Sequence, residues 1–204
     1  MKPGLLAAAL VLLGWGPPGP PGEPWREVRH AGRSRYQVVE GAGGGTLRVR
    51  SHDQNSALLR AAEIDPTRMT LRWRWRVLRH PEGADPEIRA RDDRAAGVLV
   101  IVRRSMLPWR NRALMYQWSP ARPMGEWSRS PYSREVRTLV LRSAPADSTW
   151  REEERDLGHD LATAFGEAPA RIQAIGVICD TDNTGAEAEA EFGPLEIAER
   201  GESR

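Results

Sequence analysis

The segment Asp180-Thr181-Asp182-Asn183-Thr184-Gly185 packs two carboxylates, an amide and two hydroxyls into six positions. Carboxylate and amide oxygens are the ligands that calcium prefers, so Asp180 and Asp182 are candidate calcium ligands. Asp180, Asp182, Gly185 and Glu191 also take the first, third, sixth and twelfth places of a calcium-loop pattern, although the residues before them predict a strand and not a helix. The alternative is a tight loop in which Asp and Asn side chains bond nearby backbone groups.

Asp92 and Asp93 form a second acidic pair. Adjacent carboxylates can raise one another's proton affinity enough to serve as acid and base. Because consecutive residues of a strand point to opposite faces, these two could act on one substrate only from a loop. The alternative is that one of them pairs with an arginine, for which the arginines at 72–76 are candidates.

Other catalytic signatures are absent from the sequence. The four histidines lack the short spacings of a zinc site and the His-Glu-x-x-His pattern of a metalloprotease. There is no Gly-x-Ser-x-Gly motif of a serine hydrolase. Cys179 is the only cysteine, which excludes an intramolecular disulfide and a cysteine-based zinc cluster, and its apolar neighbours predict a buried thiol.

The clearest element is a strand over residues 69–79, where apolar residues alternate with arginines. Trp73 and Trp75 fall on one face, and Arg72, Arg74 and Arg76 fall on the other. Either the indoles fill an inner face while the arginines are solvated, or the arginine row lines a concave face and binds an anionic or polyhydroxylated ligand. Eight tryptophans against three tyrosines and two phenylalanines favour sugar binding, because the apolar faces of sugars stack on indole.

The remaining patterns predict an all-β fold. Residues 36–40 and 46–50 flank a glycine-rich turn, which is typical of a hairpin. Leu157, Leu161, Ala164 and Phe165 recur at helical spacing before Gly166, so one short helix is expected. Further strands are expected at 95–102, 113–119, 136–142, 150–157, 171–180 and 188–198, with 56–64 a strand or one helical turn. About ten strands and one helix predict a two-sheet β-sandwich or jelly roll.

Three loops are candidates for function. The connection 81–93 is long and polar, and the loops 106–110 and 120–131 hold Trp109 and Trp127 as candidates for exposed aromatic side chains.

Composition limits the class of protein. The 204 residues fit one domain, expected at 25–198, and 30 basic against 28 acidic residues leave too little net charge for nucleic-acid binding. Met1-Lys2 and the apolar run 5–13 predict a signal peptide, followed by a Pro/Gly-rich linker to residue 24. The run is too short for a transmembrane helix, so a periplasmic or secreted protein is expected. Residues 199–204 are expected to be a disordered tail.

Four motifs together resemble the bacterial domain-of-unknown-function family 3047, from about Trp25 to Ile197. They are Trp73-Arg74-Trp75-Arg76-Val77, Asp92-Asp93-x-Ala95-Ala96, Ala113-Leu114-x-Tyr116-x-Trp118 and Thr181-Asp182-Asn183-Thr184-Gly185. The resemblance implies an exported bacterial protein, a β-sandwich similar to carbohydrate-binding modules, and no established activity. The chain departs from the family at Gly97, where arginine is usual, and at Met115, where asparagine is usual.

These observations favour non-catalytic binding of a glycan or another small polar ligand. The alternatives are a glycan-active enzyme of the cell envelope that uses an Asp pair, and an interaction domain marked by an exposed apolar patch. No cofactor is expected other than calcium at Asp180 and Asp182. The candidate ligand-binding residues are Trp73, Trp75, Arg76, Asp92, Asp93, Tyr116, Trp118, Asp182 and Asn183.

Overall fold

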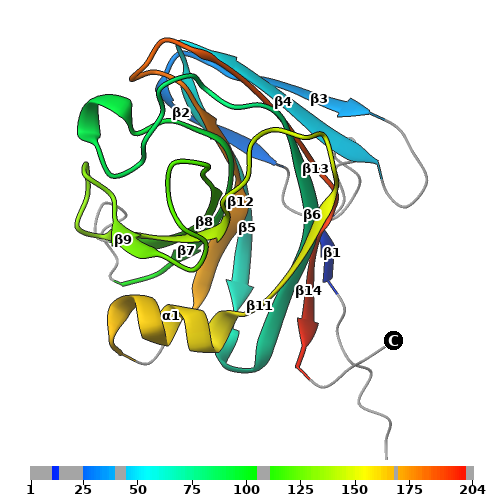
Figure 1. The fold of residues 1–204 in the computed structure, drawn as a ribbon. Coiled ribbons are helices and arrows are strands. Elements are labelled where there is room, and N and C mark those ends of the chain that lie inside the picture. The colour runs from blue at the N-terminus through cyan, green and yellow to red at the C-terminus, as the bar shows by residue number, and fades with distance from the viewer. Residues whose placement is uncertain (1–10, 14–24, 40–44, 105–110, 168–169, 201–204) are drawn as a thin grey trace, which may run out of the picture.

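The computed structural model describes residues 11–13, 25–39, 45–104, 111–167 and 170–200. Two β-sheets face one another and enclose a single apolar core, which confirms the predicted two-sheet β-sandwich (Figure 1). One short helix, α1 (Leu157–Phe165), closes one end of the core.

The first sheet is organised around β6 (Met69–Arg79). One edge of β6 pairs with β11 (Arg151–Asp156). The other edge pairs with β13 (Glu187–Phe192) and then with β14 (Leu195–Glu199), which together run as one long strand interrupted at residues 193–194. Outside them lie β4 (Thr46–His52) and β3 (Arg35–Val39) next to β13, and β1 (Val11–Leu13) next to β14.

The second sheet contains seven strands in the order β2-β5-β12-β7-β8-β10-β9. All its neighbours are antiparallel except β8 and β10, which run parallel. The strands are β2 (Arg26–Ala31), β5 (Asn55–Ile64), β7 (Arg94–Val102), β8 (Arg112–Trp118), β9 (Trp127–Arg129), β10 (Val136–Arg142) and β12 (Ile172–Asp180). Two 3-10 turns, η1 (Pro66–Arg68) and η2 (Arg89–Arg91), lie in the connections around β6.

Helix α1 follows the local signals in its sequence. Asp156 caps its first turn by accepting a hydrogen bond from the His159 backbone N–H, and Gly166 ends it in the left-handed conformation at φ 69°. Leu157, Leu161 and Ala164 point into the core. Within the described residues no helix is long and apolar enough to cross a membrane.

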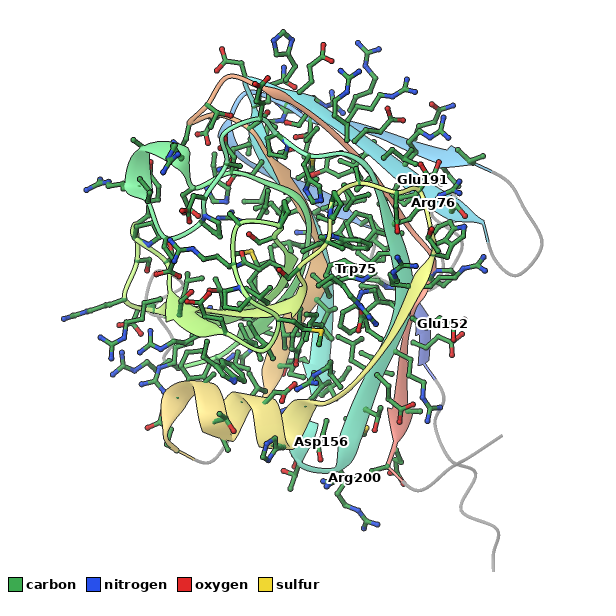
Figure 2. The ribbon with its side chains drawn as sticks, in the orientation of Figure 1. Trp75, Arg76, Glu152, Asp156, Glu191 and Arg200 are labelled. Carbon is green, nitrogen blue, oxygen red and sulfur yellow. The ribbon has the colours of Figure 1, made fainter. Side chains whose placement is uncertain are left out.

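The two faces of β6 have different surroundings, as its alternating sequence predicts. Trp73 and Trp75 are buried in the core, while Arg72, Arg74 and Arg76 are only partly covered. Figure 2 shows Trp75 inside the sandwich and Arg76 beside Glu191 on the other side of the strand. The indoles meet aromatic residues of the facing sheet: Trp73 lies 5.4 Å from Tyr116 and Trp75 lies 5.8 Å from Trp118 between ring centroids.

The arginines of β6 are matched by glutamates of neighbouring strands. Glu191 is only 2% exposed and accepts hydrogen bonds from Arg48 at 2.6 Å and from Arg76 at 2.7 Å. Arg72 pairs with Glu154 at 3.0 Å. The guanidinium groups of Arg74 and Arg76 lie 4.9 and 4.7 Å from the ring centroid of Trp150. Arg72 and Arg76 are therefore held in ion pairs on the outer face of this sheet, and Arg74 packs on Trp150.

Several elements differ from the sequence-based expectations. β2 and β9 were not predicted, residues 56–64 lie in a strand, and the last predicted strand is divided at Gly193, where an added Cβ would lie 2.6 Å from Arg74 Cγ. Residues 11–13 of the predicted signal peptide form β1, whereas residues 1–10 and 14–24 lie outside the described residues. At the other terminus Glu199 ends β14 and Arg200 pairs with Asp156 at 2.7 Å (Figure 2), while residues 201–204 lie outside the described residues.

We expect Glu191→Gln to lower the free energy of unfolding by about 2 kcal/mol, because two arginines lose a buried carboxylate. Glu187→Gln is the matched control on the same strand, since Glu187 pairs with Arg79 at an exposed position, and its cost should stay below about 0.5 kcal/mol. Urea unfolding measures both. Equal losses in the two variants would contradict a central role for Glu191.

Candidate functional site

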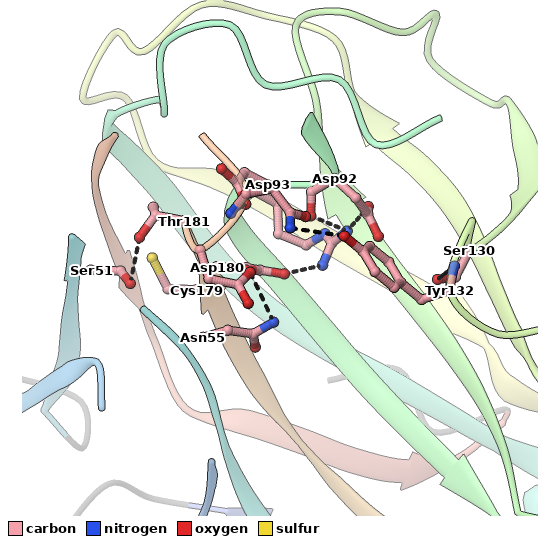
Figure 3. A network of polar contacts seen from close by, with 12 residues as sticks. Ser51, Asn55, Asp92, Asp93, Ser130, Tyr132, Cys179, Asp180 and Thr181 are labelled. Atoms are coloured by element: carbon pink, nitrogen blue, oxygen red, sulfur yellow. Dashed lines mark hydrogen bonds and ion pairs between the residues drawn. The ribbon is translucent and has the colours of Figure 1, made fainter. Parts of the chain in front are cut away.

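Polar side chains from three strands meet at one end of the second sheet (Figure 3). The central strand β12 ends at Asp180, which lies opposite Asn55 of β5 on one side and Arg94 of β7 on the other. Asp92 and Asp93 immediately precede β7, and residues 181–186 follow β12. We call this set, Asn55, Asp92, Asp93, Arg94, Asp180, Asp182 and Asn183, the rim cluster.

Arg94 is the cationic centre of the rim cluster. Its buried guanidinium donates to Asp180 Oδ2 at 2.8 Å and also pairs with Asp92. Burial lowers the pKa of Arg94, but the Asp180 and Asp92 carboxylates outweigh burial and raise it. The expectation that Asp92 or Asp93 pairs with an arginine is confirmed for Asp92, whereas the row at 72–76 is the wrong source of that arginine because it lies on the other sheet.

Asp93 holds the loop that follows β12. Its Oδ1 accepts the Asn183 backbone N–H at 3.0 Å, and its Oδ2 accepts the Thr184 backbone N–H at 2.7 Å and the Thr184 hydroxyl. The turn needs a left-handed residue, which Gly185 supplies at φ 67°. The loop is thus capped, as one interpretation of the sequence predicted, but by a side chain distant in the sequence.

The same loop is anchored from its other side by the turn between β4 and β5. The Thr181 backbone N–H donates to Gln54 O at 2.8 Å, and the Thr181 hydroxyl donates to Ser51 Oγ at 2.9 Å. Ser34 joins this buried network through Ser51 at 3.2 Å. Cys179 is buried beside it, as predicted, and burial raises the pKa of its thiol. The loop therefore has a fixed shape on a rigid base.

Tyr132 adds an exposed aromatic ring to the rim cluster. Tyr132 is 51% exposed, and its hydroxyl accepts from Asn183 Nδ2 at 2.8 Å and donates to Arg89 O at 2.8 Å. The Arg89 guanidinium lies 4.8 Å from the ring centroid. The sequence analysis did not identify Tyr132 and Arg94 as site residues. The sequence signals that could have pointed to them are that Tyr132 follows a loop with an aromatic residue and that Arg94 follows an acidic pair.

The pKa of the Asp180 carboxyl group is strongly raised. Burial raises its pKa to about 8, Arg94 opposes the shift, and the neighbouring Asp182 and Asp93 carboxyls reinforce it. One carboxylate oxygen from each of Asp93, Asp180 and Asp182 lies within 4.8 Å of the others. Such a group of carboxyls can share a proton or bind a cation.

The structure brings together only some of the predicted site residues. Asp92, Asp93, Asp182 and Asn183 lie in the rim cluster. Trp73, Trp75, Tyr116 and Trp118 are core residues between the two sheets, and Arg76 lies on the outer face of the first sheet. The loop 106–110 lies outside the described residues, and Trp127 is on β9.

The two departures from the family pattern are neighbours on the second sheet. A Cβ at Gly97 would lie 2.7 Å from Ile178 Cγ2 and 3.3 Å from Met115 Sδ. An arginine therefore does not fit at position 97 while Ile178 and Met115 occupy that space.

Asp93→Asn should cost about 1–3 kcal/mol in the free energy of unfolding and speed amide exchange at Asn183 and Thr184, because one acceptor oxygen becomes a donor. Asp65→Asn is the control, since Asp65 also accepts the backbone N–H and hydroxyl of a threonine, Thr67, but at an exposed turn. Hydrogen exchange monitored by NMR checks both variants. Unchanged exchange at residues 183–184 in Asp93→Asn would contradict this account of the loop.

Solved structures similar to this chain include carbohydrate-binding modules. The family 30 carbohydrate-binding module of the cellulosomal cellulase Cel9D-Cel44B of Clostridium thermocellum has a TM-score of 0.53 at 9% identity, with 95% of this chain and 99% of that chain covered. A crystal structure of a family 30 carbohydrate-binding module has a TM-score of 0.52 at 10% identity, with 96% of this chain and 90% of that chain covered. At such identities the similarity establishes the β-sandwich fold.

None of the curated proteins compared with the chain has a significantly similar sequence. Residues 23–196 match the family described as Protein of unknown function (DUF3047). The match spans most of the chain and confirms the resemblance carried by the four sequence motifs, so the chain belongs to the DUF3047 family.

Proposed function

We propose that this protein is an exported, non-catalytic β-sandwich that binds a glycan at the rim cluster. The observation that carries the proposal is the exposed ring of Tyr132, held by two hydrogen bonds beside Asn183. A ring that is fixed before binding loses little conformational freedom when a ligand stacks on it. The partly buried Asp182 carboxyl and Asn183 amide supply polar contacts that orient a ligand with many hydroxyls.

Two further features support the glycan class. The fold is that of carbohydrate-binding modules, although the low identity transfers no residue roles. The basic N-terminus followed by the apolar run 5–13 is typical of a signal peptide, which agrees with a periplasmic or secreted protein that meets cell-envelope or external polysaccharides.

The partners of the aspartates favour binding over acid–base catalysis. Asp92 is paired with Arg94, and both oxygens of Asp93 accept hydrogen bonds from the loop that follows β12. A general acid or base needs a carboxyl that reaches the substrate. The two carboxyls are committed to internal contacts, which suits a rigid binding surface.

A glycan array followed by calorimetry on the best ligand tests the proposal. Tyr132→Ala should weaken binding at least about tenfold, because the stacking surface is lost, whereas Tyr132→Phe should retain most of the affinity. Met124→Ala is the matched control, since Met124 is 68% exposed and lies in the neighbouring loop. Binding of no polysaccharide, or equal affinity in Tyr132→Ala and Met124→Ala, would overturn it.

A further inference from the structure

We propose that Asp93, Asp180 and Asp182 bind a divalent cation of the calcium type. The three aspartates come from separate segments, one before β7, one at the end of β12 and one in the loop beyond it. One oxygen from each lies within 4.8 Å of the others. One ion can contact all three, because calcium–oxygen bonds are about 2.3–2.6 Å long.

A second observation points to a ligand at this position. The Asp180 side chain is only 4% exposed. Its Oδ1 is buried, yet this oxygen accepts no hydrogen bond within the described part of the chain. A buried acceptor without a donor is costly, so native proteins nearly always satisfy it with a protein group, a water or an ion. The other oxygen, Oδ2, is occupied by Arg94 at 2.8 Å.

Asn55 borders the site and turns its amide nitrogen toward the carboxyls (Figure 3). Its Oδ1 is buried and likewise lacks a hydrogen-bond donor among the described residues. Asn55 lies opposite Asp180 in the β5–β12 ladder, and its Nδ2 is 3.5 Å from Asp182 Oδ1. The amide is thus beside two of the three carboxyls, and its N–H group donates to Asp182.

The charges of the rim cluster are consistent with a bound cation. Four aspartates face a single arginine, Arg94, which pairs with Asp92 and Asp180. Among the residues that the structure describes, neither Asp93 nor Asp182 has an ion-pair partner. Asp182 and Asp93, whose oxygens accept hydrogen bonds only from uncharged groups of the described residues, therefore lie close to Asp180 without a cationic partner, and a divalent ion at their centre would replace mutual repulsion with attraction.

The ligand set favours calcium over transition metals and magnesium. All three side-chain ligands are carboxyl oxygens, whereas zinc and copper sites usually contain histidine or cysteine. The ligands come from a strand end, a strand start and a loop, so irregular geometry with additional waters is expected, which calcium tolerates better than magnesium. The inference is independent of glycan binding, because the ion contacts only groups of the chain and is tested without any sugar.

Isothermal titration of the full chain with calcium chloride, after removal of metals by chelator, tests the inference. One equivalent should bind, and magnesium should bind more weakly. At a calcium concentration about 100 times the Kd, the melting temperature should rise by roughly 5–10 °C. Absence of both binding heat and a thermal shift at millimolar calcium would overturn the inference.

Asp182→Asn identifies the site. Asp182 is only partly buried, so the variant should fold, and loss of its charge should weaken calcium binding at least tenfold. Asp147→Asn is the control at an exposed loop carboxylate that pairs with Arg151, and it should bind calcium as the unmodified chain does. Equal affinity in Asp182→Asn and Asp147→Asn would place any bound calcium elsewhere and would overturn this assignment.

Discussion

Alternation of side chains along β6 is the constraint on which the sandwich depends. A strand must send successive side chains to opposite faces, and β6 places Trp73 and Trp75 on one face and arginines on the other. The two indoles pack against Tyr116 and Trp118 of the opposite sheet, so the same aromatic residues fill the core and join the layers. A shift of one residue in register would bury the arginines and expose the indoles, which fixes the pairing of β6 with its neighbours.

The buried ion centres of the two sheets have opposite arrangements of charge. On the first sheet an anion, Glu191, lies between the cations Arg48 and Arg76. At the rim cluster a cation, Arg94, lies between the anions Asp92 and Asp180. Burying an ion without a partner costs several kcal/mol, so each centre requires its flanking charges. The difference is that the rim cluster carries further aspartates beyond those that Arg94 needs, whereas the arginines of β6 lie among glutamates.

Sequence patterns predicted the features that depend on local periodicity. The strand over 69–79, the helix 157–165 with its glycine stop and the two-layer architecture are all present. Asp93 and Asp182, two of the candidate ligand-binding residues, lie in one cluster. The aromatic candidates Trp73 and Trp118 are buried in the core and are not exposed to a ligand. Alternation marks a face of a strand as apolar, but it does not show that a second sheet covers this face completely.

What the sequence left open depends on contacts between distant segments. Nothing near Arg94 in the sequence shows that β12 will bring Asp180 to it from 86 residues away. The hydroxyl of Tyr132, between β9 and β10, meets the side chain of Asn183 from 51 residues away in the sequence. The parallel pairing of β8 with β10 is equally non-local, since the segment between them must return along the sheet before β10 can begin.

The rim cluster gains its rigidity from being tied to both sides of β12. On one side Thr181 is bound to the β4–β5 turn, and on the other side Asp93 holds the backbone at Asn183 and Thr184. Asn183 in turn positions the ring of Tyr132. A chain of hydrogen bonds therefore runs from the buried end of β12 to an exposed aromatic surface. Because each link is anchored in a strand or a capped turn, the geometry exists before any ligand arrives, which is the property that separates a binding surface from a loop that is merely polar.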